Sequence, residues 1–155
     1  QFATSTEDRS KLWQARHDAA HSCNALRPGC VLWATDVCVP ISRLAECIHE
    51  TKKDLATASM PAPLVGHVGD GNFHLCFIID PDKPEEMAEA QTLNGRLIDR
   101  ALDMDGTCTG EHGVGLGKIA YMEREHGEGI SVMRAIKKTL DPDNIMNPGK
   151  IISMN

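Results

Sequence analysis

Aromatic residues are scarce in this sequence, at 4% of 155 positions, and basic residues do not outnumber acidic ones. Lys and Arg total 16 against 22 Asp and Glu, which gives a formal net charge of −6. We therefore expect neither a nucleic-acid partner held by phosphate neutralisation nor an aromatic platform for stacked bases. No apolar run approaches the roughly 20 residues of a membrane-spanning helix, so no transmembrane segment is predicted.

The six cysteines include no Cys-x-x-Cys pair and no tightly spaced framework. A chain of this length can fold without staples, so we interpret them as reduced, small hydrophobic residues in an intracellular compartment. The sequence begins at Gln1 without a signal or transit segment. We expect it to be a piece of a longer protein, in which case the lack of a targeting signal says nothing about location.

Hydrophobic periodicity and turn residues predict the order of the secondary structure. Helices are expected over residues 8–26, 40–58, 84–104 and 128–139, a strand over 30–39, a hairpin over 63–79, and irregular segments over 105–117 and 141–151. This order predicts an α+β domain with an antiparallel sheet and helices on one face. The absence of a repeat or linker favours a single domain over residues 1–155.

Two histidines flank an Asp-Gly pair in the predicted hairpin, LVGHVGDGNFHLCFII. Asp70-Gly71 is typical of a two-residue type I′ turn. Such a turn places His67 opposite His74 on one face, with Cβ atoms about 4.5–5.5 Å apart, so both could bind one metal ion. The other face is expected to be core, with Val68, Phe73, Leu75 and Phe77. Alternatively, the histidines are ordinary half-buried residues, and a three-residue turn would separate them onto opposite faces.

A glycine-rich segment, GTCTGEHGVGLGK over residues 106–118, contains five glycines around Glu111 and His112. Glu111 is the expected third metal ligand, because two His and one carboxylate leave coordination positions open, as catalytic sites require. His112 is better suited to act as a general base near neutral pH. Alternatively, His112 is the third ligand and Glu111 only accepts a hydrogen bond. A solvated connection or a phosphate-binding turn is also open, although the segment does not match G-x-x-x-x-G-K-[ST].

Three motifs resemble, in the same order, the C-terminal domain of FAD-linked oxidases of the vanillyl-alcohol oxidase type. They are GHVGDGNFH (66–74), GTCTGEHGVG (106–115) and LDPDNIMNPGKI (140–151). The resemblance is greatest to mitochondrial, cytochrome-linked members that oxidise D-lactate. It implies a ferredoxin-like substrate domain with a helical tail, which follows an FAD-binding domain that this sequence does not contain. The fragment alone is therefore expected to be inactive.

The resemblance also implies the cofactors and partners. FAD is expected, bound mainly by the absent domain, together with a divalent ion, zinc or manganese. The expected reaction converts D-lactate to pyruvate by hydride transfer to FAD, in mitochondria, with an electron acceptor such as cytochrome c. Glycolate and D-2-hydroxyglutarate are alternative substrates within the family.

By the same resemblance, individual residues receive roles. The metal ligands are His67, His74 and Glu111, the proton-abstracting base is His112, and the residue that holds the substrate carboxylate is Arg16. Asn147 and Lys150 lie in a motif on the flavin side, where a purely structural turn is an equal alternative.

The substrate can be predicted from the residues at the positions where relatives that act on D-2-hydroxyglutarate carry polar groups. This sequence has Ala20, Ala34 and Cys76 there, with Trp33 as a neighbour. An uncompensated second carboxylate in such a pocket would be costly. We therefore expect Trp33 and Cys76 to contact a monocarboxylate with a small tail, such as D-lactate.

Two functions from other classes remain open. The two-His-one-carboxylate set alone also suits a metallohydrolase or a non-haem iron oxygenase. A non-catalytic α+β binding module, with the His and Glu residues merely on its surface, is the third possibility. Flavin bound to the full-length protein would separate the first hypothesis from both.

Overall fold

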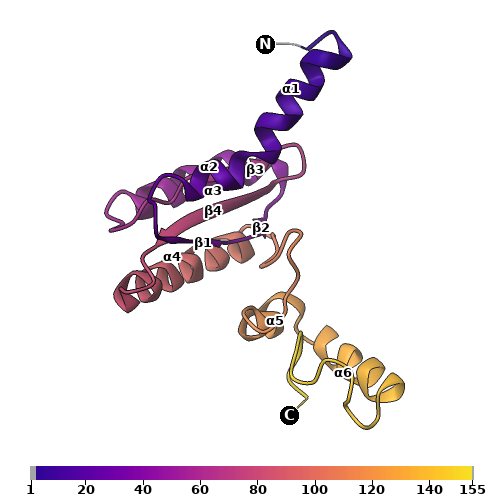
Figure 1. The fold of residues 1–155 in the computed structure, drawn as a ribbon. Coiled ribbons are helices and arrows are strands. Elements are labelled where there is room, and N and C mark those ends of the chain that lie inside the picture. Colours follow the sequence, from indigo (N-terminus) through magenta and orange to yellow (C-terminus); the bar gives the residue numbers. More distant parts are fainter. Residues whose placement is uncertain (1–2, 155) are drawn as a thin grey trace.

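The computed structural model describes residues 3–154, which fold into six helices and four strands. In chain order these are α1 (Thr6–His17), α2 (Ala19–Asn24), β1 (Val31–Ala34), β2 (Val37–Cys38), α3 (Ile41–Leu55), β3 (Leu64–His67), β4 (Asn72–Ile79), α4 (Pro84–Asp103), α5 (Ile119–His126) and α6 (Gly129–Leu140). Figure 1 shows the sheet between α2, α3 and α4, with α1 projecting at one end and α5 and α6 set apart at the other. Within residues 3–154, no helix combines the length and apolar character needed to cross a membrane.

Strand β4 is the centre of an antiparallel sheet, and all eight of its residues are buried. Strand β3 pairs along one edge, and β1 and β2 pair along the other. β1 and β2 share one register, with Val31 opposite Ile79 and Cys38 opposite Asn72. They are therefore two parts of the strand predicted over 30–39, interrupted only at Thr35 and Asp36.

The two faces of β4 are covered differently. Phe73, Leu75, Phe77 and Ile79 are each at most 1% exposed and pack with α3 and α4. The helices meet this face because their apolar residues recur three and four positions apart, as in Ala90, Leu93, Leu97 and Ala101 of α4. The other face packs Cys76 and Ile78 against Cys23 of α2. The α+β class is confirmed, and α2, which is part of the helix predicted over residues 8–26, lies on the face opposite α3 and α4.

The hairpin register differs from the prediction by two residues. His67 pairs with Asn72, and Val65 pairs with His74, so residues 68–71 form the turn. Gly71, at φ +75°, accepts the Val39 N–H at 3.0 Å, and a Cβ on it would lie 2.0 Å from the Val39 carbonyl oxygen. This contact with the residue that follows β2 holds the longer turn.

A shift of two residues preserves the face of every side chain, because side chains alternate with a period of two. His67 and His74 are therefore on one face as predicted, but diagonal to each other and not directly opposite. The prediction for Val68 is wrong: it lies in the turn and is 61% exposed.

Two helices also differ from the sequence prediction. The segment 8–26 divides at Asp18, and only its second part, α2, carries a buried residue, Cys23. No element was predicted over α5, because its eight residues are too few to show a clear helical period. Gly127, at φ +51°, ends α5 before α6, which is confirmed. These last helices have a small core of their own, with Met122, Ile130 and Ile152.

Candidate metal and active site

A hollow of about 340 Å³ opens on the face of the sheet opposite α3 and α4. Five structural regions contribute to its lining: α1, the start of α2, β1, the hairpin β3–β4 and the glycine-rich loop. The lining residues are Arg16, His17, Ala19, Ala20, Leu32, Ala34, Val65, Gly66, His67, His74, Cys76, Glu111 and His112. The structure thus brings together residues that lie almost 100 positions apart in the sequence.

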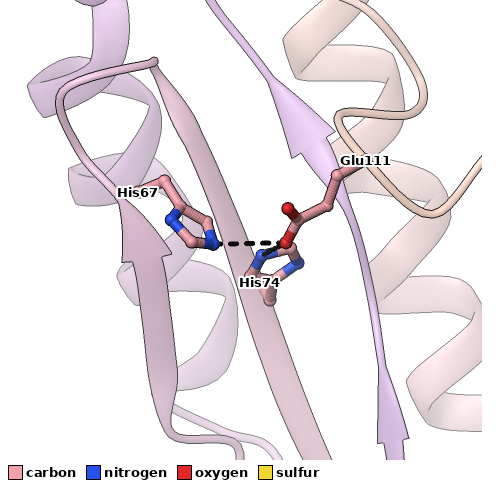
Figure 2. Close-up of side chains that lie close together, drawn as sticks. All are labelled: His67, His74 and Glu111. Carbon is pink, nitrogen blue, oxygen red and sulfur yellow. Dashed lines mark ion pairs between the residues drawn. The ribbon is translucent and has the colours of Figure 1, made fainter. Parts of the chain in front are cut away.

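Three side chains predicted as metal ligands converge at this hollow. One oxygen of Glu111, Oε1, lies 3.2 Å from His67 Nε2 and 3.1 Å from His74 Nε2. Figure 2 shows both rings directed at this carboxylate. The three candidate ligand atoms all lie within 4.8 Å of one another. Across residues 3–154, they are the one group of three such side chains with this proximity.

His74 is fixed in orientation by the interrupted strand. Its Nδ1 lies 2.9 Å from the carbonyl oxygen of Thr35, which can only accept, so Nδ1 carries the proton. In the neutral ring, Nε2 is then the nitrogen with the free lone pair, and it faces Glu111 Oε1 at 3.1 Å. Whereas the protonated ring would donate to the carboxylate directly, two such acceptors at this distance suit a shared cation. This is the usual arrangement of a metal-ligating histidine, with its other nitrogen bonded to a carbonyl.

Arg16 reaches the hollow from the C-terminal end of α1. Its Nη2 lies 2.5 Å from Nδ1 and 2.8 Å from Nε2 of His67. The guanidinium carbon lies 5.3 Å from the centre of the Trp13 ring, within the range of a cation–π contact. A cationic group is therefore present beside the three candidate ligands.

His112 follows Glu111 directly, but its side chain takes a different direction. The ring stacks on that of His74, and Nε2 lies 4.0 Å from Glu111 Oε1. His112 is half-exposed and stays outside the group of three converging ligand atoms. The arrangement can hold an ion with three side chains while leaving one imidazole for proton transfer.

Asp36 is a residue that sequence reasoning missed. It is 1% exposed, in the gap between β1 and β2, and its carboxylate accepts from Asn72 Nδ2 and from the backbone of the glycine-rich loop. Burial raises the pKa of Asp36, but hydrogen bonds from the His112 N–H, Asn72 and Thr109 outweigh it and hold the pKa well below its ordinary value. An ionisable residue within the apolar run VLWATDVCV was the available signal.

The predicted substrate residues divide between the two faces of the sheet. Cys76, with Ala20 and Ala34, lines the hollow. Cys76 is 3% exposed, and burial raises the pKa of its thiol to about 11. Trp33 does not line the hollow, because neighbouring residues of a strand point to opposite faces. Its ring packs on Phe77 at 6.0 Å, on the side of α3 and α4, which corrects its predicted place beside the substrate.

Asn147 and Lys150 lie away from the hollow that contains the histidines. They line a separate, largely apolar hollow with Met133 and Ile136 of α6. Asn147 adopts φ +46° and its carbonyl accepts the Lys150 N–H at 3.3 Å. Within this chain both residues build the turn of the tail, and the structure does not bring them to the candidate metal ligands.

Comparison with known proteins places the chain in a family. The family model described as FAD linked oxidases, C-terminal domain, matches residues 1–151. A "Probable D-lactate dehydrogenase, mitochondrial" of Danio rerio is 53% identical over 99% of this chain and 31% of its own length. A "D-lactate dehydrogenase [cytochrome], mitochondrial" of Arabidopsis thaliana is 51% identical, over 97% and 27%. A "Glycolate oxidase subunit GlcD" of Bacillus subtilis is 34% identical, over 99% and 32%.

The chain thus spans less than a third of the length of each of these relatives. The match over nearly all of this sequence agrees with the three motifs and with the α+β fold. The chain therefore belongs to the FAD linked oxidases, as their C-terminal domain.

Proposed function

We propose that this chain is the substrate- and metal-binding part of an FAD-dependent D-2-hydroxy-acid dehydrogenase that oxidises D-lactate to pyruvate. The observation that carries the proposal is the convergence of His67, His74 and Glu111 beside Arg16 and His112 in one hollow. The names of the Danio rerio and Arabidopsis thaliana relatives, which are 53% and 51% identical, support the choice of D-lactate.

The donor set fits a divalent ion. Two imidazole nitrogens and a carboxylate oxygen suit zinc and manganese, and the proton on His74 Nδ1 is already engaged by Thr35. When bound, the ion supplies Lewis-acid polarisation of the substrate hydroxyl, and the flavin supplies the acceptor of the hydride. His67, His74 and Glu111 would hold the ion.

Arg16 binds the carboxylate of the substrate. A guanidinium presents parallel N–H donors that match two carboxylate oxygens, so it fixes orientation as well as charge. Its position next to His67 brings the adjacent hydroxyl of a 2-hydroxy acid toward the three ligands.

His112 takes the hydroxyl proton on a nitrogen of its imidazole. Loss of that proton leaves electron density on the oxygen that becomes the new C=O bond as the α-hydrogen departs with its electron pair. The proton taken by His112 and the hydride that the flavin would accept together account for the two hydrogens lost when D-lactate becomes pyruvate. The half-exposed ring can return the proton to solvent.

The wall of the hollow favours a small, apolar tail on the substrate. Ala20, Ala34, Leu32, Val65 and Cys76 offer no charged partner for a second carboxylate. Beyond the ligands, the base and Arg16, His17 is the one cationic candidate among the described lining residues, so the second carboxylate of D-2-hydroxyglutarate would lie mostly against apolar groups and make it a poorer substrate. Glycolate lacks the tail altogether, and the GlcD relative makes it the second candidate.

We also propose a mitochondrial location and a cytochrome c-type electron acceptor for the whole protein. Both rest on the words "mitochondrial" and "[cytochrome]" in the names of relatives.

The test uses the purified full-length protein with its flavin. Rapid mixing with D-lactate, L-lactate, glycolate and D-2-hydroxyglutarate should bleach the flavin fastest with D-lactate, and metal analysis should find one divalent ion per chain. A full-length protein that contains no flavin, or whose flavin none of these acids reduces, would refute the proposal. Retention of the metal without flavin would instead favour a hydrolase.

A further inference from the structure

The sheet edge beside the site contains a buried carboxylate that the chemistry above does not use. Asp36 lies in the two-residue interruption between β1 and β2 and is 1% exposed. A buried carboxylate is costly unless charge-assisted hydrogen bonds compensate it. The hydrogen-bond donors to Asp36 therefore indicate which segment this carboxylate stabilises.

One oxygen of Asp36 gathers four donors from consecutive residues of the glycine-rich loop. Oδ2 accepts the backbone N–H of Gly110 at 2.8 Å, of Glu111 at 3.0 Å and of His112 at 2.9 Å, and the hydroxyl of Thr109 at 2.8 Å. Three successive amides around one anion form a concave nest. All three of these residues are exposed on the surface, yet their amides point inward to a buried group.

We propose that Asp36 is a positioning residue: its carboxylate fixes the backbone of residues 110–112 and thereby directs Glu111 and His112. Because three amide planes turn toward one oxygen, the two adjacent side chains must leave the loop in different directions. Glu111 then meets His67 and His74, while His112 stacks on His74. This inference deepens the proposed function and rests on it for the roles of the two side chains.

The surroundings of Asp36 are built for this close approach. A Cβ on Gly110 would lie 1.9 Å from Asn72 Nδ2 and 2.8 Å from Asp36 Oδ1, so the loop can reach the carboxylate only with glycine there. Asn72 Nδ2 donates to the other oxygen, Oδ1, at 2.8 Å. Lys118 Nζ donates to the Asp36 carbonyl at 2.9 Å and closes the far end of the loop.

An ion pair with Lys118 alone does not account for this geometry. The Lys118 Nζ to Asp36 Oδ2 distance is 3.5 Å, longer than each of the four contacts from the loop. The adjacent residue Thr35 orients the candidate ligand His74 on β4 through its carbonyl. Its neighbour Asp36 orients the loop that carries the candidate ligand Glu111 and the candidate base His112.

The experiment uses the full-length flavoprotein and three variants. Asp36→Asn removes the charge at almost constant volume, and Gly110→Ala keeps Asp36 but forces the loop away. The matched control is Glu86→Gln: Glu86 is also buried, at 4% exposure, and accepts from Arg27 and the Asp80 N–H at the opposite end of β4. Each protein is compared by hydrogen exchange, Co²⁺ binding with its visible absorption spectrum, melting temperature, kcat and KM.

We expect Asp36→Asn and Gly110→Ala to exchange the amides of residues 110–112 faster and to lose Co²⁺ affinity by about 10–100-fold, the usual effect of removing support behind a ligand. Their kcat should fall more than their KM for D-lactate rises, because Arg16 is not moved. Glu86→Gln should lower the melting temperature without changing exchange in the loop, Co²⁺ affinity or kcat.

Wild-type exchange and Co²⁺ affinity in Asp36→Asn would overturn the inference, as would an equal loss of Co²⁺ affinity in Glu86→Gln. Should Asp36→Asn not fold, Thr109→Val removes one of the four donors and must still speed exchange in the loop. Failure of the proposed function is distinct, because it appears in the wild type as a flavin that D-lactate does not reduce. The exchange and Co²⁺ measurements decide the role of Asp36 in either case.

Discussion

The imidazole of His112 stacks on that of His74, with ring centres 4.9 Å apart and planes inclined by 12°. His74 is buried and held by Thr35, so it gives the half-exposed ring of His112 a rigid surface to rest on. The candidate base is therefore placed by a candidate ligand, and its nitrogens remain accessible from the hollow.

The variant His112→Ala distinguishes a role of His112 as the base from a role as a metal ligand. If His112 is the base, this variant keeps its metal and flavin but reduces the flavin with D-lactate about 10²–10⁴-fold more slowly, the usual contribution of a positioned base. Stopped-flow flavin bleaching and metal analysis on the same full-length sample measure both. The control His49→Ala removes an exposed histidine of α3. A metal-depleted His112→Ala protein would show instead that His112 is a ligand.

His67→Ala and Glu111→Gln should lose metal and turnover together, while the flavin stays bound. The reason is that each removes one of the three candidate donors that converge in the hollow. Metal content by mass spectrometry and flavin content by absorbance give the two readings. Full occupancy in the double variant would rule out this metal site.

Arg16→Lys should raise the KM for D-lactate by at least tenfold with a smaller change in kcat. Lysine keeps the charge but loses the planar pair of donors that matches a carboxylate. Steady-state kinetics on the full-length enzyme are sufficient. Arg9→Lys, on the same exposed helix, is the control, and an unchanged KM in Arg16→Lys would remove Arg16 from the site.

Acidification should destabilise the protein partly through Glu86. Bidentate hydrogen bonds from Arg27, then one from the Asp80 N–H, lower the pKa of Glu86 from 4.5 to about 2. A depressed folded-state pKa gives stability that is complete above 4.5 and is lost as the pH falls toward 2. Urea unfolding at several pH values should therefore show a larger acid loss for wild type than for Glu86→Gln. Parallel losses would contradict this assignment.

The class of the fold could be predicted because it depends on local patterns. The run of aromatic and β-branched residues in β4 predicts a strand, and the apolar spacing of α4 specifies one buried face of a helix. The hairpin register could not be predicted from Asp70-Gly71, because the turn is held by the contact of Gly71 with Val39, a residue of another segment. Tertiary contact overrode the local turn preference there.

The candidate site was predictable to a similar degree. His67, His74 and Glu111 could be predicted because they lie in the sequence motifs. The predicted hairpin register was wrong by two residues, which still leaves both imidazoles on one face. Trp33 was misplaced because its neighbour Ala34 lines the hollow, and a single step along a strand reverses the side. Asp36 was missed because three of its hydrogen-bond donors are backbone amides of a distant loop, so its ionisable side chain in an apolar run was the one signal in the sequence.

The interruption at Thr35 and Asp36 serves the candidate site and is not needed for the pairing of the sheet. β1 and β2 keep the same register on β4 across it, so an unbroken strand would close the sheet equally well and leave the ligands without support. A transplant of this centre into another scaffold must therefore carry residues 34–38 along with the hairpin and the loop. A transplant of the three ligands alone would lack the Thr35 carbonyl that orients His74 and the Asp36 carboxylate that fixes the loop of Glu111.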